Sequence, residues 1–160
     1  MAVESVRTTA LDRIPYGLYV IGSLNGDVPA TMIANWVMQV SFHPPCVAVA
    51  VESDSRMHGY IRGSGRFSVN ILPAGGKETA KAFLKGPEAV AGRIGGFAFA
   101  RGKGGTPYLE AASAAFEATV TGESTAGDHT IFIGEVTDAA VFSRSDGVLT
   151  LKETGWRYTR

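Results

Sequence analysis

Apolar and polar residues alternate along several short stretches of the chain, and this pattern predicts strands. Residues 35–42 alternate so that positions 36, 38 and 40 share one face and positions 37, 39 and 41 the other. Residues 47–51 are apolar on both faces, which is typical of a central, buried strand. Further strands are expected at 17–24, 28–33, 67–72, 115–121 and 130–142, the last with a bulge or bend at Gly134.

Turn residues separate these strands. Asn25-Gly26-Asp27 predicts a tight hairpin turn, because Asn-Gly supplies the positive φ angles that such a turn requires. Pro44-Pro45 interrupts backbone hydrogen bonding. Residues 87–106 contain six glycines and are expected to form an irregular, mobile excursion, while residues 122–129 are expected to form a polar turn.

Short helices are expected between the strands. Residues 5–13 look like a short helix that Pro15 prevents from continuing, and Ser55 caps a second helix that ends near residue 64. A third helix is expected at 77–85, with candidate inward positions at Thr79, Ala80, Phe83 and Leu84.

The order of these elements indicates the fold class. Strands and helices do not alternate regularly, which argues against a doubly wound parallel sheet. We expect a mainly β fold, a small and mostly antiparallel barrel with short inserted helices. The chain has 160 residues, so we expect one domain spanning residues 1–160.

Charge narrows the classes of partner. The formal net charge is zero, so we expect neither a nucleic-acid surface nor an anionic membrane surface. Residues 56–85 nevertheless contain six basic residues and a single acidic one, Glu78. This segment is either the solvated face of a helix or a pocket for a small phosphorylated anion.

Cysteine and histidine content sets further expectations. Cys46 is the only cysteine, so no intrachain disulfide forms, which fits a reducing cytoplasm. We find neither a signal peptide nor an apolar run approaching the ~20 residues of a membrane helix. His43, His58 and His129 lie far apart without metal-ligand spacing, so we expect no metal.

Two stretches are candidates for ligand binding. The small and polar residues at 31–35, with Ser41 nearby, suit either a backbone-rich cradle for a planar ring or a strand crossover that simply packs. Ser53-Asp54-Ser55-Arg56 stands at a strand-to-helix junction, where exposed N–H groups and Arg56 favour a phosphate. The alternative there is plain N-capping by Ser55, and both readings can hold together.

A third candidate is Gly127-Asp128-His129, which precedes the long strand. An imidazole at this turn either contacts a nicotinamide, by a hydrogen bond or by stacking, or is an ordinary surface histidine.

Three stretches together resemble the flavin reductase-like family, whose members have an FMN-binding split β-barrel of Greek-key type. They are PATMIANWVMQVSFHPPCVAVAV, SDSRMHGYIRGSGRFSVNIL and GDHTIFIGEV, in the family's order. The resemblance implies binding of FMN or FAD, a homodimer with the flavin near the subunit interface, and hydride transfer from NADH or NADPH to the flavin N5.

The resemblance also implies roles for individual residues. His129 is implied at the nicotinamide side, and the chemistry itself is carried by the flavin. Ser53, Ser55 and Arg56 are implied to hold the ribityl phosphate, assisted by Lys81, with Phe83 over the flavin or its tail. The isoalloxazine ring is implied to lie against Ala30, Thr31, Met32, Ile33, Ala34, Asn35 and Trp36, with Ser41 nearby.

One departure from the common family pattern leaves the activity open. Trp36-Val37-Met38 follows Asn35, and the form Ile-Ala-Asn…Gln-Val-Ser is similar to the flavin domains of flavoredoxins and high-molecular-weight rubredoxins. The leading hypothesis is an NAD(P)H:flavin oxidoreductase, either free-standing or the reductase component of a two-component monooxygenase. The alternatives are an FMN electron-transfer protein serving protein partners, and a non-redox binding barrel.

Overall fold

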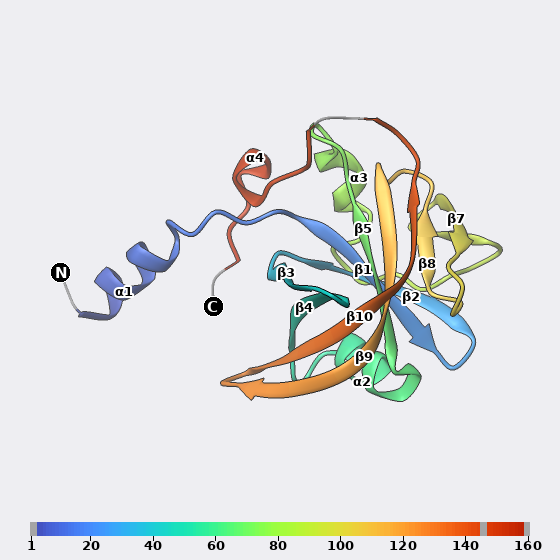
Figure 1. The fold of residues 1–160 in the computed structure, drawn as a ribbon. Helices are drawn as coiled ribbons and strands as arrows, with labels where there is room; N and C mark the ends of the chain where they lie inside the picture. The colour runs from blue at the N-terminus through green and yellow to red at the C-terminus, as the bar shows by residue number, and fades with distance from the viewer. Residues whose placement is uncertain (1–2, 145–146, 159–160) are drawn as a thin grey trace.

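The computed structural model describes residues 3–144 and 147–158, and it is dominated by one antiparallel sheet of seven strands in the order β2-β1-β5-β9-β10-β4-β3 (Figure 1). The strands of this sheet are β1 (Tyr19–Asn25), β2 (Val28–Ala34), β3 (Val37–Phe42), β4 (Pro45–Glu52), β5 (Arg66–Ile71), β9 (Ala114–Ala126) and β10 (His129–Val141). A second, three-stranded sheet contains β6 (Arg93–Ile94), β7 (Phe97–Arg101) and β8 (Pro107–Leu109). The helices are α1 (Val3–Leu11), α2 (Arg56–Ser64), α3 (Lys77–Lys81) and α4 (Leu151–Thr154).

The predicted mainly β, antiparallel fold with short helices is confirmed, but the large sheet is not closed into a barrel. Strands β2 and β3 form its two edges. Only Asn35 and Trp36 join these edge strands along the chain, so the sheet must curl until its edges approach each other. Next to β3, the Ala50 N–H of β4 donates to the Trp36 carbonyl at 3.0 Å, which continues the β3–β4 pairing into this link. The opening between β2 and β3 is where the candidate site lies.

The free edge of β2 is covered by the segment at residues 87–89. The Thr31 N–H donates to the Pro87 carbonyl at 3.0 Å, and the Ala89 N–H donates to the Pro29 carbonyl at 2.7 Å. Pro29 has no N–H to give to a ladder, and an edge strand is the position where proline is tolerated. This cover satisfies backbone groups that would otherwise leave β2 open to association with another strand.

Two hydrophobic clusters fill the interior. One lies between the large sheet and α2 and includes Ile61, Phe67 and Phe132, all fully buried. The other lies under the small sheet and includes Leu72 and Leu109, also fully buried. Helix α2 begins as predicted, because the Ser55 hydroxyl accepts from the His58 N–H at 3.2 Å.

Gly134 confirms the predicted irregularity in the long strand. The β9–β10 register shifts between Ile133 and Gly134. A Cβ atom at position 134 would lie 2.8 Å from the Ala118 Cβ and 2.8 Å from Phe67 Cε1. Glycine is therefore required here because the strand passes directly over the core.

Three expectations were wrong in detail. Residues 87–106 are not wholly irregular: they contain β6 and β7, which pair through Arg93–Ala98 and Ile94–Phe97. Residues 122–129 are not one polar turn, because β9 continues to Ala126 and only Gly127-Asp128 turn the chain. The polar side chains of residues 122–126 are explained by their exposure in the long β9–β10 hairpin, which projects from the body of the molecule (Figure 1).

The third correction concerns α3. The helix ends at Lys81, and residues 82–85 form turns. Ala80 and Phe83 are buried as predicted, whereas the Leu84 side chain is 55% exposed. The early helix end redirects Leu84 away from the core.

The N-terminal helix and the C-terminal segment are placed differently relative to the sheet. Helix α1 extends away from the sheet (Figure 1), and its residues 6–11 are exposed. Helix α4 and residues 155–158 instead return to the sheet, where the Leu18 N–H donates to the Leu149 carbonyl at 3.0 Å. No helix in the described ranges is both long enough and apolar enough to span a bilayer.

Candidate functional site

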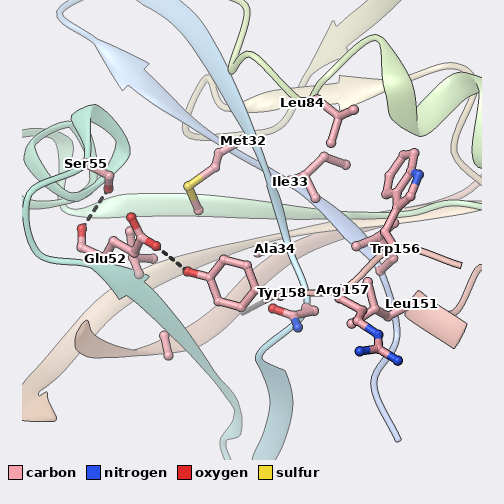
Figure 2. Close-up of a pocket in the computed structure, with 14 residues that line it drawn as sticks. Met32, Ile33, Ala34, Glu52, Ser55, Leu84, Leu151, Trp156, Arg157 and Tyr158 are labelled. Atoms are coloured by element: carbon pink, nitrogen blue, oxygen red, sulfur yellow. Dashed lines mark hydrogen bonds between the residues drawn. The ribbon is translucent and has the colours of Figure 1, made fainter. Parts of the chain in front are cut away.

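A cavity of about 560 Å³ opens between the end of β2, the end of β4 and the C-terminal segment (Figure 2). This volume suits a cofactor-sized organic molecule. The cavity is lined by Leu18, Met32, Ile33, Ala34, Asn35, Ala50, Val51, Glu52, Ser55, Leu84, Leu151, Trp156, Arg157 and Tyr158.

The β2 wall contains the predicted small-residue cluster. Met32, Ile33, Ala34 and Asn35 all line the cavity, because β2 ends there and the chain turns toward β3. The Asn35 side chain makes no hydrogen bond to any described residue, although the residue is only 7% exposed. A primary amide offers two donors and an acceptor, so Asn35 is equipped to bind a polar ring edge in the cavity.

Trp36 lies behind this wall in a group of aromatic rings. Its indole is 4.7 Å from the His129 ring and 5.2 Å from the Tyr158 ring, centroid to centroid. Trp36 Nε1 is the one buried side-chain nitrogen or oxygen without a hydrogen-bond partner in the described part of the chain. A buried N–H without an acceptor costs about 1–3 kcal/mol. Trp36 itself does not line the cavity, so this cost is borne behind the wall.

The strand-to-helix junction reaches the cavity through Ser55. The Ser55 hydroxyl donates to the Glu52 carbonyl at 2.8 Å while it accepts from the first turn of α2. The N-capping role is thus shown, and the nine-residue helix directs its free N–H groups toward this end of the cavity.

Arg56 links the same junction to the segment that covers β2. Its Nη2 donates to the Gly86 carbonyl at 3.1 Å, and its Nη1 lies 4.0 Å from Glu88 Oε1. Glu88 also accepts from the Tyr60 hydroxyl at 2.7 Å, and this hydrogen bond, followed by burial, raises the pKa of Tyr60. The Arg56 side chain remains 64% exposed, so a phosphate at the junction can still reach it.

His129 is close to the cavity but does not line it. It is 6% exposed and begins β10, opposite Glu52 of β4. Its Nδ1 lies 2.6 Å from Asp128 Oδ1 and its Nε2 lies 3.1 Å from the Tyr158 hydroxyl. Tyr158 therefore stands between the imidazole and the cavity, and Figure 2 shows its ring with the hydroxyl directed at Glu52.

Several predicted site residues lie elsewhere. Ala30 is 1% exposed in the β1–β2 ladder, and the buried Thr31 hydroxyl donates to the Pro87 carbonyl at 2.8 Å. Ser53 is exposed near the junction, with its hydroxyl 3.3 Å from that of Thr130. Ser41 lies on β3 opposite Cys46 and does not line the cavity.

Lys81 at the end of the basic helix and Phe83 in the following turn are also outside the cavity. Lys81 forms an exposed pair with Glu78 within α3, at 2.6 Å. Phe83 is fully buried and packs on Phe97 with ring centroids 5.8 Å apart, so no surface of it is available to a ligand. Leu84, the next residue, lines the cavity in its place.

The sequence reasoning missed the far wall of the cavity. Glu52, Trp156, Arg157 and Tyr158 line it, and the last three form a short aromatic and basic group near the chain end. The only signal in the sequence was a pattern of two aromatic residues flanking an arginine in a polar segment. No feature of the neighbouring residues indicated that this group would pack beside β4.

Comparisons with known proteins show which family the chain is similar to. The family model described as "Flavin reductase like domain" matches residues 11–159. The chain is 34% identical over 148 residues to diflavin flavoprotein A 1 of Synechocystis, covering 92% of this chain and 26% of that protein. It is 32% identical over 153 residues to the ferric-chelate reductase (NAD(P)H) of Archaeoglobus fulgidus, covering 88% of this chain and 84% of that protein.

A third relative is the high molecular weight rubredoxin of Moorella thermoacetica, 33% identical over 144 residues, covering 87% of this chain and 62% of that protein. The chain spans about a quarter of the length of the two diflavin flavoproteins that it matches at 26% and 25% coverage. The matches therefore include flavin domains embedded in much longer proteins.

Solved structures agree with this grouping. The flavin reductase PheA2 superposes with a TM-score of 0.75 at 32% identity, covering 92% of each chain. The Streptomyces globisporus NADH:FAD oxidoreductase SgcE6, solved with NAD and FAD fragments, superposes with a TM-score of 0.80 at 25% identity, covering 99% of this chain and 93% of that one.

Proposed function

We propose, given that this chain belongs to the flavin reductase-like domain family, that it is a flavin-binding oxidoreductase which accepts hydride from NADH or NADPH onto FMN held in the cavity. FAD is the alternative flavin. The flavin supplies the redox chemistry when it is bound, and the protein supplies position and electrostatics.

One observation carries this proposal: the cavity presents an unsatisfied polar side chain at the position where the family resemblance puts the flavin ring. Asn35 lines the cavity, and its amide bonds no described residue. The rim of a flavin ring offers carbonyl and ring-nitrogen acceptors and one N–H edge, which match this amide. Backbone N–H groups near residues 31–36 would add donors that favour the more negative, reduced ring.

The opposite end of the cavity suits the phosphate. Ser55 lines it at the start of α2, and Arg56 adds an exposed cation beside the 85–88 segment. A helix N-terminus and a guanidinium both favour an anion. We therefore place the ribityl phosphate at Ser53, Ser55 and Arg56, and exclude Phe83 from the contacts.

An electron-transfer role between protein partners is the second candidate. The covered position of His129 favours it, because neither imidazole nitrogen is open to a nicotinamide while Tyr158 and Asp128 are bonded to them. The relatives that support this candidate include a diflavin flavoprotein and a high molecular weight rubredoxin. In this role the acceptor is a redox protein or a monooxygenase component.

We also propose a homodimer formed through β3. Met38 and Phe42 on this edge strand are 64% and 78% exposed, and Val40 between them is 41% exposed. The β3–β4 register shifts between Gln39 and Ser41, so regular alternation does not run through Val40, and the exposure of the three side chains is what marks an apolar free edge.

We further propose a cytoplasmic location, which the single cysteine, Cys46, fits.

One experiment separates the two redox roles from a non-redox binding barrel. The purified protein is loaded with FMN, and its visible flavin absorbance is followed after anaerobic addition of NADH and then NADPH. Bleaching with either nucleotide supports the reductase. A protein that holds FMN but bleaches only with a reduced redox protein supports the carrier, and a protein that binds no flavin contradicts both.

A further inference from the structure

A continuous line of hydrogen bonds crosses the wall of the cavity, from Asp128 through His129 and Tyr158 to Glu52. The Asp128 carboxylate is 2.6 Å from His129 Nδ1, and His129 Nε2 is 3.1 Å from the Tyr158 hydroxyl. The same hydroxyl donates to Glu52 Oε1 at 2.6 Å. These residues come from the β9–β10 turn, the start of β10, the C-terminal segment and the end of β4.

The Tyr158 hydroxyl joins two partners in this line. It donates to the Glu52 carboxylate, and the same oxygen lies within hydrogen-bond distance of His129 Nε2. The side of the imidazole that would face the cavity is therefore covered by Tyr158.

The C-terminal segment is attached to the body at two places. The chain leaves α4 at Gly155, whose φ of 70° ends the helix, and residues 156–158 belong to no helix or strand. At the base of the segment, Trp156 packs against the buried cluster under the small sheet, and Lys77 Nζ lies 6.0 Å from its ring centroid. Farther along, Tyr158 reaches across the cavity, where its hydroxyl contacts His129 and Glu52 and its ring packs on those of Trp36 and His129.

We propose that residues 156–158 form a latched strap over the cavity, that the Tyr158 hydroxyl is its catch on Glu52 and His129, and that a molecule which reaches His129 must displace this catch. The inference deepens the proposed function, and it rests on that function only for the identity of the entering molecule, the nicotinamide of NADH or NADPH. Tyr158 is a positioning residue for His129 in the closed state.

Ring nitrogen NMR of the protein as purified, labelled with ¹⁵N-histidine, tests the latch without turnover. The His129 signals are assigned by their loss in His129→Gln. Tyr158→Phe keeps the ring on Trp36 but removes the hydroxyl at His129 Nε2, so the Nε2 chemical shift of His129 should change while the signals of His58 stay the same. An unchanged Nε2 shift in Tyr158→Phe overturns the latch.

Steady-state kinetics tests the displacement. Tyr158→Phe is expected to lower the KM for NADH about fivefold, the equivalent of one net hydrogen bond. Tyr16→Phe is the matched control, because the Tyr16 ring packs on Trp36 at 6.3 Å and its hydroxyl bonds no described residue. An unchanged KM in Tyr158→Phe overturns the displacement. If no variant oxidises NADH, the proposed function fails, while the NMR result still decides the latch.

Discussion

The indole of Trp36 packs on the imidazole of His129 with ring centroids 4.7 Å apart and planes inclined by 51°. This contact joins the link between β2 and β3 to the first residue of β10, across the opening of the sheet. It also connects two of the three stretches that carry the family resemblance. A change at either residue should therefore be felt in the cavity as well as in the sheet.

Replacing Asn35 by leucine should weaken FMN binding about tenfold. The change keeps the approximate size of the side chain but removes the amide that faces the cavity, which is worth about one hydrogen bond to a polar ring edge. Fluorescence quenching during FMN titration measures the Kd. Gln39→Leu is the control, since this amide lies exposed on β3 and bonds only the Ser41 carbonyl, at 3.1 Å. Equal affinities in the two variants would remove Asn35 from the site.

Trp36→Phe should change the free energy of unfolding by less than about 1 kcal/mol. The protein loses part of a packed ring, but it also loses a buried N–H without an acceptor, and the two effects oppose each other. Urea unfolding measures the difference from the wild-type protein. A loss of about 3 kcal/mol would show that Trp36 is an ordinary core residue.

Glu117→Gln should destabilise the protein by about 3 kcal/mol. Glu117 is fully buried and accepts from the Gly104 N–H at 2.6 Å, the Thr106 N–H at 3.1 Å and the Thr106 hydroxyl at 2.5 Å. An amide cannot accept all of these bonds, and it places its own donors among theirs. Glu123→Gln removes an exposed pair with Arg62 and should cost less than about 1 kcal/mol in the same urea experiment.

Stability should fall in strong alkali, and Tyr108 should contribute to that fall. Burial, and then the hydrogen bond to Asp138 at 3.0 Å, raise the pKa of the Tyr108 hydroxyl. The folded state thus holds its proton more tightly than the unfolded state, whose tyrosines titrate at about 10. This contribution is complete below that pH and is lost as pH rises toward the folded-state value.

Thermal unfolding across the alkaline range measures this effect. Tyr108→Phe should show a shallower decline of Tm than the wild-type protein. Tyr16→Phe is the comparison variant and should follow the wild-type curve. A Tyr108→Phe curve parallel to the wild type would mean that this hydroxyl ionises with the same ease in both states.

Phe42→Lys should dissociate the proposed homodimer. Phe42 is 78% exposed on the edge strand β3, and a charge on such an edge opposes pairing with a second copy. Light scattering after size exclusion gives the mass in solution. Leu11→Lys, on the exposed helix α1, places the same charge on another apolar position and should leave the mass unchanged. A monomeric wild-type protein would disprove the dimer directly.

Features with a local cause were predictable from the sequence. The β1–β2 turn follows from Asn25-Gly26, the start of α2 from Ser55, and the irregularity of β10 from Gly134. Each depends on the conformational preference or hydrogen-bonding capacity of a few neighbouring residues. The near wall of the cavity, Met32 to Asn35, was predictable for a similar reason, because a run of small and polar residues interrupts a strand pattern.

Features with a distant cause were not predictable in this way. Glu52 and Tyr158 are 106 residues apart and meet only because the C-terminal segment folds back over β4. The direction of Phe83 depends on Phe97 across the small sheet, which a local helical pattern does not contain. The small sheet was hidden by its glycines: Gly95 and Gly96, with φ angles of 58° and 85°, make a hairpin turn there.

The link of Asn35 and Trp36 between opposite sheet edges also sets a rule for length. Adding or removing one residue there would reverse which side chains of β3 point inward and would pull the two edges out of alignment. This two-residue link has no regular secondary structure, yet we expect it to tolerate insertions less than other loops of the chain.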